Sequence, residues 1–328
     1  MLATRQPDEI LNEITENIKD KFGLKVFDAE INHFGYANLK WRIRTDSGVF
    51  FVKQYNSVRY SDELLQSVEV ALELQDRLNK AGIPCPKILN KQGTYIHRTQ
   101  SGERYMITEF CDGQMVNPGE INIHQMHNLG QITGRLHHWL NTNAPQSLPL
   151  HWKPDTKEGM LRNWSQNWLD AQFAGSNKYI AALEQQRKIA DEINLEIFDL
   201  CEEGWVHWDL FVDNILFHTD KVTAILDFDR MNYIYPEFDI SRAILSGAIL
   251  DGSFNIESAR AFINGYRQSI PITRPKLIRS IKLTWWKEAS WINVKSEDHR
   301  TLKRFVDELI WVSNNWTMLE EVCNDLLV

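Results

Sequence analysis

Residues 206–214, which read VHWDLFVDN, place side chains that could do chemistry at a short and defined spacing. Transfer of a phosphoryl group needs a carboxylate that orients the attacking hydroxyl and accepts its proton. It also needs an oxygen ligand for a magnesium ion that neutralises the phosphates. Asp209 suits the first task and the amide of Asn214 suits the second. The segment therefore favours Asp209 as a catalytic base and Asn214 as a metal ligand.

A further carboxylate follows in the segment 224–229, which reads AILDFD. Short apolar runs at 215–217 and 223–226 surround a polar turn, and this pattern predicts a β-hairpin that ends near Asp227. A carboxylate at a strand end suits a hard cation, which prefers oxygen ligands. We expect Asp227 to bind magnesium, whereas Asp229 is either a second metal ligand or a turn residue.

The elements before residue 112 must position part of this chemistry. Apolar residues recur at helical spacing over 8–22 and 62–80, and shorter patterns typical of strands lie at 26–31, 39–43, 49–53, 95–98 and 104–110. Helix, strands, helix and strands in this order predict an α+β lobe with a mostly antiparallel sheet.

The remainder of the chain is mostly helical by pattern. Helices are expected at 121–141, 158–173, 178–200, 238–250, 256–269, 274–293 and 298–326, with the hairpin at 215–226 as the only β interruption. The predicted domains are therefore a small N-terminal sheet lobe, 1–112, which ends in a hinge, and a larger helical lobe, 113–328. A ligand cleft is expected between such lobes.

Composition excludes several classes of function. The formal net charge of −8 argues against a nucleic-acid-binding protein, which needs a basic face. The four cysteines form no C-x-x-C spacing, which fits a reducing compartment. The first residues lack the apolar stretch of a signal peptide, and no apolar run approaches the ~20 residues that span a bilayer. We expect a cytoplasmic protein with no membrane partner, and the sequence leaves its oligomeric state open.

The motifs HWDLFVDNILF, AILDFDR, EFDISRAI, GIPCP and FVKQY together resemble the aminoglycoside phosphotransferase and choline kinase superfamily. The resemblance extends over nearly the whole chain and is nearest to small-molecule kinases of the homoserine kinase type. It implies a bilobal protein-kinase-like fold, ATP and Mg²⁺ as cofactors, and a small-molecule hydroxyl as phosphate acceptor. No G-x-x-x-x-G-K-[ST] motif of the P-loop kind occurs.

The resemblance also implies roles for residues of the first lobe. Lys53 matches the lysine that contacts the α- and β-phosphates, and Glu69 is its expected partner, with Glu63 and Glu73 as alternatives. The backbone groups of Glu109 and Cys111 match the hinge that pairs with the adenine edge. The loop 33–38 resembles the loop that covers the phosphates, although it contains a single glycine.

Two residues of the second lobe match structural positions of the family. His207 is expected to brace the catalytic loop, and Asp239 is expected to accept hydrogen bonds from the N–H groups of that loop.

Three functions remain open on these grounds. The first is an ATP-dependent phosphotransferase that acts on an amino alcohol, an amino acid or an aminoglycoside-like compound. The second is a bacterial protein Ser/Thr kinase of the stress-response type. The third is a non-catalytic pseudokinase, which the presence of Lys53, Asp209, Asn214 and Asp227 disfavours, because a scaffold has no physical need for all four.

Overall fold

The computed structural model describes residues 5–32 and 38–327. The chain divides into two compact units. The first contains Met1–Gly113 and Thr223–Met231, and the second contains Gln114–Val222 and Asn232–Val328. The sequence analysis expected one division near residue 112 and did not anticipate that 223–231 belongs with the first unit.

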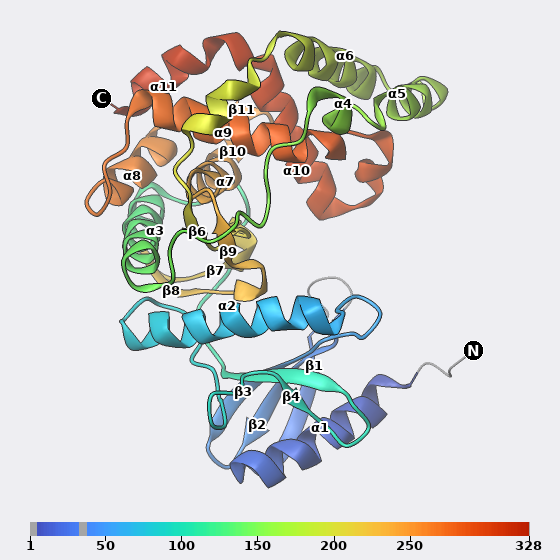
Figure 1. Ribbon diagram of the computed structural model, residues 1–328, viewed down its shortest axis with the longest axis vertical. Helices are drawn as coiled ribbons and strands as arrows, with labels where there is room; N and C mark the ends of the chain where they lie inside the picture. The colour runs from blue at the N-terminus through green and yellow to red at the C-terminus, as the bar shows by residue number, and fades with distance from the viewer. Residues whose placement is uncertain (1–4, 33–37, 328) are drawn as a thin grey trace. The chain divides into compact units, whose positions relative to one another are not determined.

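The first unit contains a mixed set of helices and strands (Figure 1). Its elements are α1 (Pro7–Phe22), β1 (Val26–Ile31), β2 (Lys40–Thr45), β3 (Gly48–Gln54), α2 (Asp62–Lys80), β4 (His97–Arg98), β5 (Arg104–Glu109) and a short 3₁₀ turn, η3 (Phe228–Arg230). The strands form a sheet in the order β1-β2-β3-β5-β4, in which every neighbouring pair is antiparallel. The predicted α+β class is confirmed.

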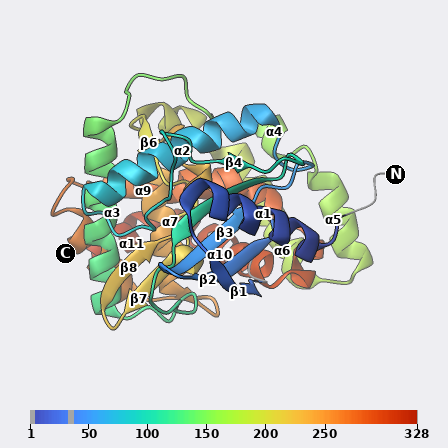
Figure 2. The ribbon, with the colours of Figure 1, turned by 90° about the horizontal axis from the view of Figure 1, so that it is seen from below.

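Helices α1 and α2 cover opposite faces of this sheet. Ile10, Ile14 and Ile18 recur every fourth position and so lie on one face of α1, where they pack against a core that includes Val52 and Ile107. Helix α2 packs against a second core cluster on the other face of the sheet. This cluster contains Met106, whose neighbours along β5 point to the α1 face, because successive strand residues point to opposite faces. Figure 2 shows α1 lying across the strands of the sheet.

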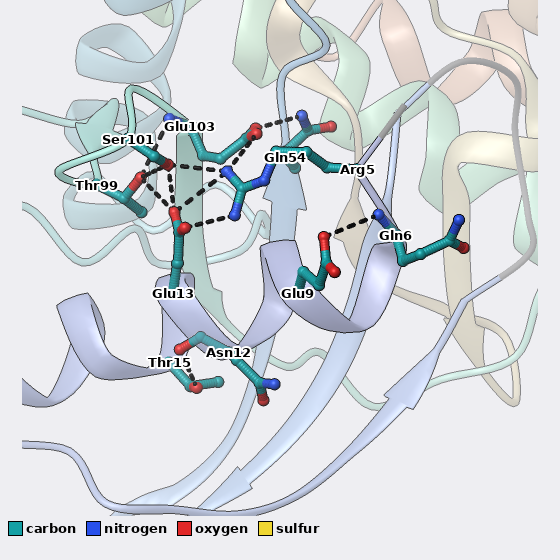
Figure 3. A network of polar contacts seen from close by, with 10 residues as sticks. All are labelled: Arg5, Gln6, Glu9, Asn12, Glu13, Thr15, Gln54, Thr99, Ser101 and Glu103. Carbon is teal, nitrogen blue, oxygen red and sulfur yellow. Dashed lines mark hydrogen bonds and ion pairs between the residues drawn. The ribbon is translucent and has the colours of Figure 1, made fainter. Parts of the chain in front are cut away.

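The start of α1 is joined to the edge of the sheet by a polar network (Figure 3). The guanidinium of Arg5 forms an ion pair with Glu13 and lies 3.2 Å from the carboxylate of Glu103. The same side chain donates to Ser101 Oγ at 2.9 Å, and Gln54 donates to Glu103 at 2.9 Å. The network holds the start of α1 against the end of β3 and the turn between β4 and β5.

The second unit is mostly helical. Its helices are α3 (Ile123–Asn143), α4 (Lys157–Met160), α5 (Trp164–Phe173), α6 (Asn177–Glu192), α7 (Glu237–Ala248), α8 (Ile256–Tyr266), α9 (Arg274–Glu288), α10 (Arg300–Asn314) and α11 (Leu319–Leu327). Its 3₁₀ turns are η1 (Leu195–Leu200), η2 (Val212–Asn214), η4 (Ala289–Trp291), η5 (Val294–Asp298) and η6 (Trp316–Met318). In the described ranges no helix is long and apolar enough to cross a membrane.

Short strand pairs accompany these helices. They are β6 (Gly204–Val206) with β9 (Asn232–Ile234), β7 (Ile215–His218) with β8 (Lys221–Ile225), and β10 (Ile249–Leu250) with β11 (Ser253–Phe254). The division between the units falls within β8. The expectation of a single β interruption at 215–226 was wrong, because β6, β9, β10 and β11 are too short to leave a readable alternation.

Three of the predicted helices are interrupted. The predicted helix 158–173 breaks between Met160 and Trp164, the predicted helix 178–200 ends at Glu192 and is followed by the turn η1, and the predicted helix 298–326 breaks after Asn314. At the last of these breaks the side chain of Asn315 donates to the carbonyl of Trp311 at 2.8 Å and so satisfies one of the free carbonyl groups at the helix end. The apolar spacing gave no sign of these breaks.

Helices α3 and α8 lie side by side and approach closely at glycines (Figure 1). A Cβ atom at Gly130 would lie 2.0 Å from the carbonyl oxygen of Phe262, and one at Gly265 would lie 2.1 Å from that of His127. Only glycine permits this backbone contact. The close packing fixes α3, which carries a histidine that supports the catalytic loop.

Candidate active site

The segment 207–214 begins directly after β6, whose pairing with β9 fixes the start of the loop. Trp208 adopts a left-handed backbone conformation with φ of 62°, which is uncommon for a bulky residue. The chain then enters the turn η2 and continues into β7. The strained residue therefore stands immediately before Asp209, and such strain persists only where the surroundings enforce it.

Asp239 supplies part of that enforcement. It is fully buried in α7, and its carboxylate accepts hydrogen bonds from the N–H groups of His207 at 2.7 Å and Trp208 at 2.9 Å. The same carboxylate lies 3.0 Å from Nε2 of His137 on α3, which donates to it. Tyr266 on α8 lies 3.0 Å from Nδ1 of that histidine. Three helices thus hold the loop, in the manner expected for Asp239.

The carboxylate of Asp209 and the amide of Asn214 contact each other. The Nδ2 group of Asn214 donates to the backbone carbonyl of Asp209 at 2.8 Å and to its Oδ2 atom at 3.0 Å. The N–H of Asp209 in turn donates to Nδ1 of His207 at 3.3 Å. Because the nitrogen of the Asn214 amide faces Asp209, its oxygen is the atom that can meet a cation.

The far side of the loop is held by α10 and α7. Nη1 of Arg304 donates to both carboxylate oxygens of Asp213, each at 2.8 Å. The ring of Phe211 lies 4.4 Å from that of Phe305, measured between centroids, and the N–H of Val212 lies 3.3 Å from Ser246 Oγ. The sequence analysis did not identify Arg304, because it lies far from the loop along the chain and carries no local signal.

A buried ion cluster lies behind these contacts. Arg242 donates to Glu288 at 2.9 Å and to Glu308 at 2.7 Å, and all three side chains are almost fully buried. Burial raises the pKa of Glu288 to about 7. The positive charges of Arg242 and Lys287 oppose this rise, and the negative charge of Asp209 adds to it. Glu288 therefore lies within the electrostatic reach of the catalytic loop.

The first unit contains the second set of site residues, centred on Lys53 in β3. The Nζ atom of Lys53 lies 2.7 Å from Asp227 Oδ1 and 2.6 Å from Asp229 Oδ2. Burial disfavours the charge of Lys53, but the two carboxylates outweigh burial and hold the pKa of Lys53 above its usual range. The lysine is therefore fully charged, as a phosphate-binding group must be.

The two acids differ in exposure and in conformation. Asp227 adopts φ of 61°, and its side chain is 32% exposed. Asp229 is buried and accepts a hydrogen bond from the hydroxyl of Tyr55 at 3.0 Å. Burial raises the pKa of Asp229, and the neighbouring Lys53 opposes this effect. Asp229 is thus held inside the unit, whereas Asp227 presents a carboxylate that other groups can reach.

The expected pair between Lys53 and Glu69 requires correction. The carboxylate oxygens of Glu69 accept hydrogen bonds from the N–H groups of Tyr95 at 2.6 Å and Ile96 at 2.9 Å, so Glu69 joins α2 to the chain before β4. The alternatives Glu63 and Glu73 are exposed on α2. The lysine instead receives its carboxylates from 227 and 229, which no pattern on α2 could reveal.

Lys40 is a further cation at this site that the sequence analysis missed. It lies directly opposite Lys53 in the pairing of β2 with β3, so both side chains project from the same face. Burial and the charge of Lys53 lower the pKa of Lys40, while Asp227 and Asp229 oppose the shift. The turn between Thr45 and Gly48, which pair with each other, sets the register of β2 with β3. The position of this turn in the sequence could therefore have predicted that Lys40 lies opposite Lys53.

The hinge residues lie at the end of β5. The N–H of Glu109 donates to the carbonyl of Lys87 at 2.9 Å, and its side chain forms an ion pair with Lys87 at 2.7 Å. That N–H is therefore already used, which leaves the carbonyl of Glu109 and the backbone groups of Cys111 as candidates for adenine binding. In the loop expected to cover the phosphates, residues 33–37 lie outside the described residues, and the Asn38 amide donates to Tyr60 at 3.3 Å.

The donor set fits a hard cation. Asn214 offers an amide oxygen and Asp227 a carboxylate, and both are ligands that magnesium accepts. Within residues 5–32 and 38–327 no group of three or more His, Cys, Asp or Glu side chains could hold a metal ion.

Known proteins are similar to this chain in sequence or in fold. A homoserine kinase of Rhodopseudomonas palustris (strain BisA53) is 26% identical over 244 residues, which cover 73% of this chain and 69% of the relative. A microcompartment-associated aminopropanol kinase superposes with a TM-score of 0.65 at 13% identity, over 94% of this chain and 98% of the other. A spectinomycin phosphotransferase, solved with ADP and spectinomycin, gives 0.60 at 14% identity, over 95% and 97%.

Residues 28–272 match the sequence profile of a family described as "Phosphotransferase enzyme family". The match covers well over half of the chain and includes Lys53, the loop 207–214 and Asp227. The kinase-like fold agrees with it. The chain therefore belongs to the phosphotransferase enzyme family and is a phosphotransferase whose acceptor is an alcohol group.

Proposed function

We propose that the chain transfers the γ-phosphoryl group of ATP to the hydroxyl of a small molecule that also carries an amino group. Amino acids and amino alcohols are the first candidates, and aminoglycoside-like compounds come next. In this reaction the acceptor oxygen bonds to the γ-phosphorus as the bond to the β-phosphate oxygen breaks. Asp209 takes the hydroxyl proton.

The contact between Asn214 and Asp209 is the observation that carries this proposal. The amide donates to Asp209 twice, and Asp239 holds the preceding backbone, so the carboxylate is fixed before any acceptor arrives. Phosphoryl transfer depends mainly on positioning and charge neutralisation, and a fixed base meets the first requirement.

The remaining residues take the nucleotide. Lys53 binds the α- and β-phosphates, and the carbonyl of Glu109 and the N–H of Cys111 bind the adenine edge. Asn214 and Asp227 hold magnesium, which neutralises charge on the phosphates when it is bound. Nucleotide binding then requires Asp227 to exchange part of its contact with Lys53 for the cation, and the partial exposure of Asp227 supports this role.

The relatives support the class of acceptor. Homoserine and aminopropanol, after which two of them are named, are small hydroxyl compounds that carry an amino group. The net charge of −8 also suits a cationic metabolite.

The test is a screen for acceptor-dependent release of ADP over amino acids, amino alcohols, sugars and aminoglycosides. Loss of a general base costs about 10²–10⁴-fold, so Asp209→Asn should reduce kcat within that range while ATP binding persists. Asp199→Asn, which changes an exposed acid in η1, is the matched control and should retain wild-type activity.

Three results would contradict the proposal. Undiminished turnover by Asp209→Asn would remove the assigned base. Activity confined to peptide acceptors would indicate a protein kinase instead. Magnesium-dependent nucleotide binding with no turnover on any acceptor would indicate a pseudokinase.

A further inference from the structure

A small cavity lies on the second unit, at the end of the β6–β9 strand pair that points away from the catalytic loop. Its volume is about 320 Å³, and it is lined by parts of the segment 150–155, by the turn η1 and by residues that precede β6 or follow β9. Gly204 pairs with Ile234 at this end, whereas the loop leaves from the other end, where Val206 pairs with Asn232. Among the described residues, none of 207–214 lines the cavity.

The charged groups that line this cavity are mainly acidic. In the described lining, the carboxylates of Asp155, Asp199 and Glu203 accompany one ammonium group, that of Lys153. All four side chains are exposed, and within the described part of the chain none of the three acids forms an ion pair. The potential in the cavity is therefore negative, and it favours a cation over an anion.

The hydroxyl of Tyr235 indicates a ligand independently of these charges. Tyr235 is only 7% exposed, yet within residues 5–32 and 38–327 no group forms a hydrogen bond with its hydroxyl. Burial raises the pKa of Tyr235 to about 12, and the neighbouring Cys201 and Glu203 add to the rise. Both neighbours also line the cavity, so the hydroxyl end of the ring lies on the cavity side. Buried polar groups are almost always hydrogen bonded, and this one lacks a partner from its own chain.

Apolar side chains form the remaining walls. Leu150 and Leu195 are partly buried, and Phe198 is buried beside them. Sites for small ligands usually combine apolar walls with a few convergent polar groups, in cavities of roughly 300–1,000 Å³. A compact ligand with a cationic end and a short hydrocarbon part matches this lining.

We propose that this cavity is a binding site for a small aliphatic amine, separate from the position of the phosphate acceptor. The ammonium group donates to the hydroxyl of Tyr235 and to the carboxylate of Glu203, and the methylene groups contact Leu195 and Phe198. A tyrosine hydroxyl can accept such a hydrogen bond while it keeps its own proton. The ligand needs no hydroxyl group, so the site does not depend on the proposed function.

The segment 150–155 connects this site to the surroundings of the catalytic loop. Leu150 lines the cavity, whereas the ring centroid of His151 lies 5.2 Å from that of Trp208. The ring centroid of Trp152 lies 6.4 Å from that of Tyr235 and 5.7 Å from Lys287 Nζ. An amine that binds only the folded chain stabilises it by mass action, so the melting temperature should rise with amine concentration.

The experiment compares three ligands of equal chain length, pentylamine, pentanamide and pentanoate. Calorimetric titration of the full chain without nucleotide measures affinity, and thermal melts measure stabilisation. Pentylamine should bind saturably at one site and raise the melting temperature. Pentanamide and pentanoate should bind at least about tenfold more weakly, because they lack the charge that the carboxylates attract.

Two substitutions test the assigned contacts, and each has a matched control. Tyr235→Phe should weaken the binding of pentylamine about threefold to tenfold, and Glu203→Gln about tenfold or more. Tyr233→Phe removes a buried hydroxyl that instead accepts from the N–H of Ser147 at 3.2 Å. Glu202→Gln changes the adjacent exposed acid, which lies 2.6 Å from Lys276. Neither control residue lines the cavity, so both variants should retain wild-type affinity.

Four results would overturn the inference. The first is the absence of saturable binding of pentylamine to the wild type. The second is affinity that Tyr235→Phe and Glu203→Gln leave unchanged, which would place the amine at another position, such as that of the acceptor. The third is an equal loss in Glu202→Gln, which would indicate attraction to the overall negative charge alone. The fourth is equal binding of pentanoate. Because no result involves turnover, failure of this site and failure of the proposed function remain distinguishable.

Discussion

Single residues at this site carry unfavourable electrostatics that a ligand could relieve. Lys40 and Lys53 face each other across two strands, and like charges at such positions destabilise a sheet by about 0.2–1 kcal/mol. The lowered pKa of Lys40, caused by burial and by Lys53, reflects the same conflict. Asp227 and Asp229 already pair with Lys53, and a triphosphate would add further negative charge on the face that the two lysines share.

Lys40→Gln tests this interpretation through two opposite effects. Without nucleotide, the variant should unfold at a higher temperature than the wild type, because a repulsive charge is gone. Its affinity for ATP should fall about tenfold, which corresponds to about 1.4 kcal/mol for one charged contact. Calorimetric titration and thermal melts measure the two effects. Arg42→Gln, an exposed change on the same strand, is the control, and a lower melting temperature for Lys40→Gln would argue for a purely structural lysine.

Arg304 acts at the same scale through Asp213, the residue before Asn214. Its guanidinium binds both oxygens of that carboxylate and also lies 3.3 Å from Glu308. The Phe211 and Phe305 rings pack beside it, with Arg304 Cζ 4.4 Å from the centroid of Phe305. Both bonds leave the single nitrogen Nη1, and together with the ring packing they hold Asp213 in place, so Arg304 is a positioning residue for the loop.

Arg304→Gln should lower kcat on the order of ten- to hundredfold, because small displacements of reacting groups are costly. A cycle with Asp213→Asn separates this effect from general destabilisation. If the two side chains act as a pair, the double variant should lose less free energy of unfolding than the sum of the single variants, by about 0.5–3 kcal/mol. Urea unfolding measures the cycle, and strict additivity would show that the pair contributes nothing.

At the scale of elements, α10 is joined to α6 and η5 by exposed charges. Lys178 on α6 lies 2.7 Å from Glu297 and 2.7 Å from Asp307, and Lys303 lies 2.8 Å from Glu297. Hydrogen bonds from Lys178 and Lys303 hold the pKa of Glu297 down at about 2. These contacts secure the helix from which Arg304 extends toward the loop.

The pH dependence of stability follows from that shift. The pKa of Glu297 in the folded protein lies below its usual value. Its ion pairs therefore contribute fully to the free energy of unfolding above pH about 4.5, and this contribution disappears as the pH falls toward 2. Glu297 is partly exposed, so Glu297→Gln should lower the free energy of unfolding at pH 7 by at most about 1 kcal/mol. The difference from the wild type should shrink at pH 3.5. Urea unfolding at both pH values measures it, with the exposed Glu184→Gln as control.

At the scale of the whole molecule, the chain passes from one unit to the other after residues 113, 222 and 231. The segment 223–231 supplies both carboxylates that neutralise the buried Lys53. It also donates a backbone hydrogen bond from Ile225 to the carbonyl of Pro84 at 2.8 Å. The first unit is therefore incomplete when it is taken as the continuous stretch that precedes residue 114.

Residues 1–113 expressed alone should show no cooperative thermal transition by circular dichroism. Removing the partners of a buried charge costs about 3–5 kcal/mol, a large part of the stability of a small domain. Lys53→Met in the same fragment removes that charge and should recover part of the transition. If the fragment and its Lys53→Met form melted alike, segment 223–231 would not be required to neutralise the lysine.

The sequence by itself determined the α+β class and the helices near 8–22 and 62–80, and it predicted the segment 207–214 as the centre of the chemistry. These features are local, because helical spacing, turn residues and a short loop motif each lie within a few turns of chain. For the same reason the spacing could not locate the break after Asn314, where a side chain ends the helix.

Only the tertiary structure decided which side chains meet. It paired Lys53 with residues 227 and 229, occupied Glu69 with backbone N–H groups, brought Arg304 to Asp213, and surrounded Lys287 with aromatic rings. Each of these contacts joins residues that are remote along the chain. For each residue the sequence offers many possible partners of suitable charge. Burial and the packing of helices and strands select one partner among them, and this selection has no local pattern.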